Sequence, residues 1–329
     1  MRVIVERPQD RTRTAACRLR NVLVYVVRRV LWSVPVILVA LLVTFALMRG
    51  IGGTPFHPSE SEVIPIPVQH ELEDYYHLDR PWPAQFATYV WHIVRFDFGP
   101  TLSYRDVSVD TTIRKQVPVS LELAALSGAV AIVLGFALGI AAAVRRGKLV
   151  DLALTTLATI FLAVPVFLFA SVGRDYLVDD WHLVGVGWTT WQTRFLPILV
   201  LALAPAGYIA RLVRAGVVET LSEDYVRFAR AKGLRPHRVL VFHVLPNSLL
   251  PFLSAAVPVL ALLVTSAFFV EPLFEVPGAA AAFIDSAERR DYPVVMGLTA
   301  VLAVLVVYAV LVADVLAAAL DVRLREAGR

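Results

Sequence analysis

The sequence has little charge and almost no cysteine. Charged residues make up 18% of its 329 positions, whereas hydrophobic residues make up 58% and the mean hydropathy is +0.68. This balance exceeds the apolar content of soluble domains and predicts an integral membrane protein. Cys17 is the only cysteine, which excludes an intrachain disulfide and a metal site built from thiolates.

Motifs for catalysis and cofactor binding are also missing. The sequence contains no Gly-x-x-x-x-Gly-Lys-[Ser/Thr] phosphate loop and no His-Glu-x-x-His pattern, and its seven histidines are scattered. We therefore predict that the chain is not an enzyme and holds no metal or cofactor of its own. Its net charge of +4 requires no nucleic-acid partner, because membrane topology explains the basic excess.

What the sequence does contain is a series of long uncharged runs. A helix needs about 20 apolar residues to cross a bilayer, and we predict six spans, at about 30–48, 123–144, 152–173, 195–214, 248–270 and 292–313. The fourth uncharged run ends at residue 210, and we extend it because Arg211 and Arg214 can reach the interface. The expected fold is an all-α membrane protein, with the first run retained as a helix because no small-residue cleavage site follows it.

The distribution of basic residues orients these spans. Pieces 1–29, 145–151, 211–247 and the tail after residue 313 carry 21 of the 31 Lys and Arg residues, while the alternate pieces carry 18 of the 27 acids. By the positive-inside rule, both termini are cytoplasmic. The predicted organisation is a cytoplasmic segment 1–29, a six-helix domain 30–313 and a cytoplasmic tail 314–329, with an external segment 49–117 and a cytoplasmic loop 215–247.

The external segment is expected to be ordered. After a proline-rich start, it has a helical pattern at 68–78 and an aromatic, amphipathic pattern at 82–98. These aromatic side chains either lie along the outer membrane surface or form a platform for an external partner, and the pattern favours neither.

Two prolines and one acid are candidates for a transport pathway. Pro118 is expected in the first turn of the second span, Pro165 should kink the third span, and Glu271 follows the fifth. A kink serves either packing or a pathway. No charged residue lies deep in a predicted span, which argues against an ion-coupled secondary transporter, although a membrane scaffold remains an alternative.

The cytoplasmic loop carries the most information. Thr220-Leu-Ser-Glu223 has the spacing of a capping box, so we expect a helix to begin there and to end at Gly233. Pro236 suits the first turn of a second helix that reaches towards Pro246. The positive-inside rule explains the charges of this loop, but it does not explain the capping, the glycine or the exposed Phe228. We therefore predict a docking element.

The same loop resembles a known signature. The run Tyr225-Val-Arg-Phe-Ala-Arg-Ala-Lys-Gly-Leu234, followed by Leu245-Pro246, is similar to the Glu-Ala-Ala loop of binding-protein-dependent ABC importer permeases. It resembles the dipeptide and oligopeptide branch, in which arginine takes the glutamate position, as Arg227 does here. The motifs that extend the resemblance over about residues 23–325 are Leu78-Asp-Arg-Pro81, Phe96-Asp-Phe-Gly99, Val117-Pro-Val-Ser-Leu-Glu-Leu-Ala124, Val270-Glu-Pro-Leu-Phe-Glu-Val-Pro-Gly278, Arg290-Asp-Tyr-Pro293 and Leu320-Asp-Val-Arg-Leu-Arg325.

The sequence departs from the family at four places, one of which is the compact stretch between the third and fourth predicted spans. Phe228 stands where a threonine is common, Val276 lies near a usual tryptophan, and Ile51-Gly-Gly-Thr-Pro55 replaces Pro-Gly-Asp-Pro. These departures affect substrate identity and the details of docking.

The resemblance implies a type I ABC importer permease fold and a non-catalytic subunit in a bacterial or archaeal plasma (inner) membrane. Its implied partners are two cytoplasmic ATPase subunits or domains that bind ATP and Mg, a second homologous permease, an extracytoplasmic binding protein and the lipid bilayer, with no nucleic acid. The implied cargo is a peptide, with nickel chelates or small sugars as alternatives.

The resemblance also implies how the loop works. Phe228 would anchor the loop in a cleft of an ATPase, Arg227, Arg230 and Lys232 would form a polar rim, and Gly233 would set the turn. The full set of implied coupling residues is Tyr225, Arg227, Phe228, Ala229, Arg230, Lys232, Gly233, Leu234, Leu245 and Pro246.

Overall fold

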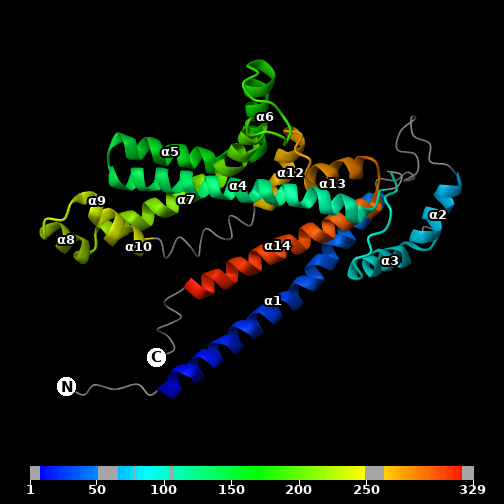
Figure 1. The fold of residues 1–329 in the computed structure, drawn as a ribbon, viewed down its shortest axis with the longest axis horizontal. Helices are drawn as coiled ribbons and strands as arrows, with labels where there is room; N and C mark the ends of the chain where they lie inside the picture. The colour runs from blue at the N-terminus through cyan, green and yellow to red at the C-terminus, as the bar shows by residue number, and fades with distance from the viewer. Residues whose placement is uncertain (1–7, 51–65, 78, 104–106, 249–262, 321–329) are drawn as a thin grey trace.

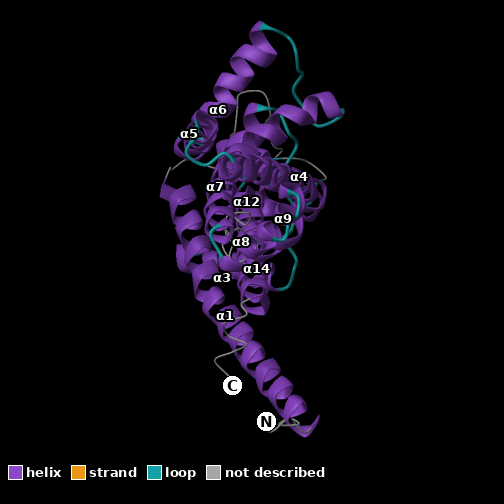
Figure 2. Ribbon diagram, turned by 90° about the vertical axis from the view of Figure 1, so that its left-hand side faces the viewer, coloured by secondary structure: helices purple, strands orange, loops and turns teal. Residues whose placement is uncertain are grey.

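The computed structural model describes residues 8–50, 66–77, 79–103, 107–248 and 263–320. Within these ranges the chain is helical, with one isolated β-bridge between Pro100 and Ser108 and no longer strand (Figures 1 and 2). This confirms the helical fold class that the apolar runs predict.

Four described helices are long and apolar enough to cross a membrane. They are the Val26–Gly50 part of α1 (Pro8–Gly50), α4 (Val109–Val144), α7 (Trp191–Leu221) and the Tyr292–Val312 part of α14 (Tyr292–Leu320). A bent pair of helices adds a fifth crossing if it is counted as one span. Most of the span predicted at 248–270 lies outside the described residues, and its end is the short apolar helix α12 (Leu263–Leu273).

Three helices form the central layer. α4, α5 (Leu149–Ala163) and α7 pack side by side (Figure 1). α4 and α7 approach closely because glycines face α7. A Cβ atom built on Gly135 would lie 2.4 Å from Ile209 Cγ2, and one on Gly139 would lie 2.6 Å from the Ala210 oxygen. Such small residues allow helix backbones in a membrane to pack tightly.

The α4 helix begins earlier than predicted. Its N-cap is Ser108, whose Oγ accepts a hydrogen bond from the Thr111 N–H at 3.2 Å. Pro118 therefore lies inside α4, and its expected place in a first turn is wrong. A serine cap more than two turns upstream, where the sequence is less apolar, sets the start of this helix.

The third predicted span is two helices. α5 ends at Ala163 and α6 (Val166–Gly173) begins after Pro165, with a bend of 98° between the two halves of the pair. Proline disfavours helical geometry in the residue before it, and Val164 is extended, with φ −81° and ψ 125°. The expected break at Pro165 is confirmed, but it is much larger than a kink. α6 continues into the π-helix η1 (Arg174–Asp180) and projects from the layer (Figure 1).

The described part of the segment that is predicted to be external packs at the end of α1 and α14. It contains α2 (Ile66–Tyr76) and α3 (Trp82–Val94), as the sequence predicts. Tyr76 and Tyr89 are buried and their rings stack at 5.3 Å. The α1 and α14 helices lie side by side and contribute Leu41, Phe45 and Met296 to the same core.

Asp291 fastens this segment to the membrane helices. Its side chain is fully buried at the start of α14, and Oδ2 accepts hydrogen bonds from the N–H groups of Leu102 and Ser103, both at 3.1 Å. Burial raises the pKa of Asp291 to about 6, although these backbone donors oppose the shift.

Candidate functional site

The predicted docking helix is present, and one of its faces is fixed to the bundle. α8 (Asp224–Ala231) lies beyond the end of α7, at one end of the central layer (Figure 1). Val226 and Ala229 are buried, at 0% and 4% exposure, and they join a core cluster with Val213 and Val217 of α7. These two positions are three residues apart, so they lie on one face of the helix.

The opposite face is exposed, apolar at its centre and basic around it. Phe228 is 62% exposed and Tyr225 is 42% exposed, while Arg227, Arg230 and Lys232 are also exposed. Lys232 Nζ lies 4.6 Å from the centre of the Phe228 ring, which is the distance of a cation–π contact. An exposed aromatic ring with cations beside it has the composition of a protein-binding surface.

Gly233 turns the chain back. It has φ +79°, a conformation that favours glycine, and its N–H donates to the Arg230 oxygen at 2.9 Å. No atom lies within 4 Å of a Cβ built at this position, so the backbone conformation, not space, requires glycine. The next residue, Leu234, packs partly buried against the same core cluster as Val226.

The return path is a series of short helices. α9 (Pro236–Val239) begins at Pro236 as predicted, and the π-helix η2 (Leu240–Val244) and α10 (Leu245–Ser248) follow. Leu245 is partly buried against the core cluster, and Pro246 is exposed.

A polar network links this return path to α8. Asn247 Nδ2 donates to the Tyr225 hydroxyl oxygen at 3.1 Å and to the His243 carbonyl oxygen at 2.9 Å. The Tyr225 hydroxyl donates to the same carbonyl at 3.4 Å. The Tyr225 side chain is thus held by Asn247, which lies 22 positions later in the sequence.

The predicted capping box is wrong. α7 continues through Thr220 to Leu221, and Ser222 is its C-cap, with Oγ donating to the Glu219 oxygen at 2.6 Å. α8 then begins after Glu223, whose side chain makes no capping bond. Burial of Thr220 and Val217 against the bundle extends α7 past the residues that resemble a helix start.

Comparisons with known proteins identify related sequences. Residues 135–326 match the family described as binding-protein-dependent transport system inner membrane component. The chain belongs to this family. It is 35% identical over 302 residues to the dipeptide transport system permease protein DppB of Bacillus subtilis (strain 168), covering 92% of this chain and 97% of that protein. It is 32% identical over 305 residues to the oligopeptide transport system permease protein OppB of Escherichia coli (strain K12), covering 92% and 99%.

Solved structures of ABC transporters share the fold of this family member. An inward-facing MetNI methionine ABC transporter superposes with a TM-score of 0.53 at 21% identity, covering 64% of this chain and 96% of that one. An amino acid ABC transporter solved with histidines gives a TM-score of 0.50 at 14% identity, covering 63% and 92%.

The pathway candidates lie in other parts of this family member. Pro118 and Pro165 belong to α4 and to the α5–α6 break. Glu271 is fully buried, and its Oε2 accepts hydrogen bonds from the N–H groups of Ala280, at 2.8 Å, and Ala281, at 3.3 Å. These donors belong to the first turn of α13 (Ala279–Glu288). Glu271 therefore accepts hydrogen bonds from free N–H groups at the start of that helix, where the helix dipole favours a carboxylate. A pathway role for the three residues stays a prediction.

Sequence reasoning missed the residues that hold the site in place. Asn247 gave no signal, because its partner Tyr225 lies on another helix. Asp151 and Arg214 form an ion pair across 63 positions, and no local periodicity joins residues so far apart.

Proposed function

We propose that this chain is the permease subunit of an ATP-driven peptide importer, and that α8 with its return path is the surface on which a cytoplasmic ATPase docks. The observation that carries the proposal is the geometry of α8. Val226 packs against Val213 and Val217 of α7 at 0% exposure, while Phe228, two residues later, is 62% exposed beside cations. A short helix fixed on one face and apolar on the other can both bind a partner and transmit a displacement.

The partners follow from this role. Two ATPase subunits or domains would bind ATP and Mg and hydrolyse ATP, a second related permease would form the other half of the pathway, and an extracytoplasmic binding protein would deliver the cargo. The proposed setting is a bacterial inner membrane crossed six times, with cytoplasmic termini, as the distribution of Lys and Arg supports.

The peptide cargo is supported by relatives that are named as dipeptide and oligopeptide permeases. A binding protein that selects the cargo would leave this subunit without a tight binding site. Nickel chelates and small sugars are the alternative cargoes, and the same uptake assay with each compound distinguishes them.

The docking proposal is tested by substitution at the exposed ring. Removing a central aromatic anchor costs about 2 kcal/mol, which weakens binding about thirtyfold. We therefore expect Phe228→Asp to lose co-purification with the ATPase subunits and to abolish dipeptide uptake. Trp181, which is 62% exposed in the connection between η1 and α7, provides the matched control, and Trp181→Asp should retain the ATPase subunits. Full association of the Phe228→Asp variant would refute the proposed surface.

A further inference from the structure

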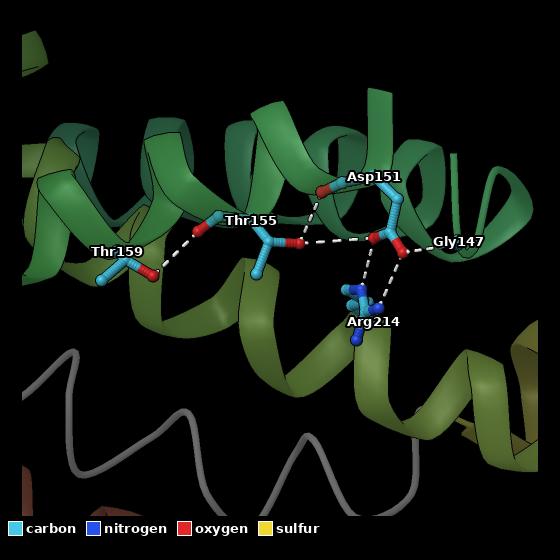
Figure 3. A network of polar contacts seen from close by, with 5 residues as sticks. All are labelled: Gly147, Asp151, Thr155, Thr159 and Arg214. Carbon is cyan, nitrogen blue, oxygen red and sulfur yellow. Dashed lines mark hydrogen bonds and ion pairs between the residues drawn. The ribbon is translucent and has the colours of Figure 1, made fainter. Parts of the chain in front are cut away.

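A buried carboxylate joins the α4–α5 corner, α5 and α7 (Figure 3). Asp151 is 6% exposed and lies in the first turn of α5. Arg214 of α7 grips it with two hydrogen bonds, from Nε to Oδ1 at 2.7 Å and from Nη2 to Oδ2 at 2.8 Å. Two parallel bonds of this kind fix direction as well as distance.

The α4–α5 corner and the next turn of α5 complete the network. The Gly147 N–H donates to Asp151 Oδ2 at 2.9 Å, and Thr155 Oγ1 donates to the Asp151 carbonyl oxygen at 2.7 Å (Figure 3). The carboxylate also lies at the start of α5, where the helix dipole favours a negative charge. The charge of Asp151 is therefore satisfied only when the corner, α5 and α7 keep their relative positions.

A second fixed point lies further along the same helix pair. A Cβ atom built on Gly207 of α7 would lie 2.4 Å from the Ala158 oxygen of α5, so the two backbones are in close contact there. Gly207 precedes Arg214 by seven residues, and Ala158 follows Asp151 by the same number. At 1.5 Å per residue, the two contacts are about 10 Å apart along the antiparallel helices. One contact alone would act as a pivot, whereas two contacts fix the crossing angle.

The end of α7 connects this pair to α8. Val213, next to Arg214, and Val217 share a core cluster with Val226 of α8. A displacement of α8 therefore reaches α7 at the turn that carries Arg214. The ion pair is a polar connection through which α7 can displace α5, the helix that ends at the Pro165 break.

We propose that the Asp151–Arg214 ion pair is a positioning pair that makes α5 move with α7 when α8 moves, so that ATP hydrolysis is converted into transport. This inference rests on the proposed function. Both residues act through the helices that they hold and touch neither ATP nor cargo.

A second ion pair, at the other end of α7, serves as the control that distinguishes a coupling role from a purely stabilising one. Arg194 Nη1 contacts Glu122 Oε1 of α4 at 2.8 Å, where it also joins α7 to a neighbouring helix. The Glu122→Gln/Arg194→Gln variant removes an interhelical ion pair from the same helix, far from α8. The side chains of Arg194 and Glu122 are 24% and 44% exposed, against 31% and 8% for Arg214 and Asp151. Thermal unfolding of both variants is therefore measured as well, so that a loss of coupling is separated from a loss of stability.

The experiment reconstitutes the full complex, including its ATPase subunits, second permease and binding protein, in liposomes with a radiolabelled dipeptide. We expect Asp151→Asn to lower the dipeptide carried per ATP hydrolysed by about fivefold or more. Arg214→Gln should do the same, and the double variant should be no worse than either single variant, because the two residues act as one unit. The Glu122→Gln/Arg194→Gln control should keep the wild-type ratio. An unchanged ratio in Asp151→Asn, or an equal loss in the control, overturns the inference.

A second measurement does not depend on the cargo. In a Cys17→Ser background, spin labels at the exposed positions Leu149 of α5 and Ser222 after α7 report the separation of the two helix ends. We expect one narrow distance distribution in both the ADP-bound and the vanadate-trapped complex, and a broadened, nucleotide-dependent distribution in Asp151→Asn. Identical distributions in the two proteins overturn the inference. Failure of the wild-type chain to bind ATPase subunits would instead refute the docking proposal, and binding without dipeptide uptake would refute only the peptide cargo.

Discussion

Val226 is the larger of the two buried side chains that pack α8 against the bundle. α8 has eight residues, and a helix of this length is unstable in water without tertiary packing. Val226 is fully buried. Val226→Ala removes two methyl groups, whose burial contributes about 0.8 kcal/mol each, and leaves a small cavity. Together these effects destabilise the packed position of α8 by about 2 kcal/mol. If α8 opens as a unit, this change raises its open population about thirtyfold.

Hydrogen exchange followed by mass spectrometry measures this opening directly. We expect exchange in residues 224–232 of the Val226→Ala chain to be about thirtyfold faster than in the wild type, with exchange in the middle of α4 unchanged. Arg230→Ala changes an exposed residue of the same helix and should leave the rate nearly unaltered. Exchange within a factor of about two of the wild-type rate in Val226→Ala would show that packing at this residue does not hold α8, and the reasoning would fail.

Three further predictions follow from the geometry. Gly233→Ala places a side chain at φ +79° and should destabilise the loop by about 1 kcal/mol, with a smaller loss for Gly233→Asn, as measured by exchange in the same segment. Gly207→Val forces atoms into the α5–α7 contact and should destabilise the chain by about 1–3 kcal/mol, measured by thermal unfolding, whereas Gly50→Ala, where nothing lies within 4 Å, should be neutral. Because the pKa of folded Asp291, about 6, exceeds its ordinary value of 3.8, the folded chain binds this proton more tightly than the unfolded chain. Stability should therefore fall by about 3 kcal/mol as the pH rises from about 4 to 6; unfolding temperatures of the wild type and Asp291→Asn across this range check it, and parallel curves would contradict it.

The sequence predicts those features of the cytoplasmic loop that depend on the backbone preference of a single residue. Gly233 and Pro236 end one helix and begin the next as expected, because a left-handed residue and a fixed φ act at their own positions. The start of α8 was predicted wrongly at Thr220, since burial of α7 against the bundle overrides a capping motif. Where a helix ends therefore depends on contacts distant in the sequence when the preceding helix is buried against the core, as α7 is.

The remaining features could not be predicted from local pattern. Pro165 predicts a kink in the third span, but the 98° bend between the two helices depends on what α6 packs against. The Asp151–Arg214 pair requires that α5 and α7 lie side by side and antiparallel, as they do at the close contact of Gly207. Long-range pairing of this kind requires the fold before its members can be matched.

The division of α8 into two faces has a consequence for the evolution of transport complexes. The residues tolerated at the buried positions Val226 and Ala229 are limited by packing within this chain, whereas those at the exposed positions are limited only by a binding partner. Substitutions at Phe228 and its basic neighbours can therefore accumulate without loss of the membrane fold. On the proposed docking surface, changes at a few adjacent codons would give a duplicated importer its own ATPase, separate from that of its parent.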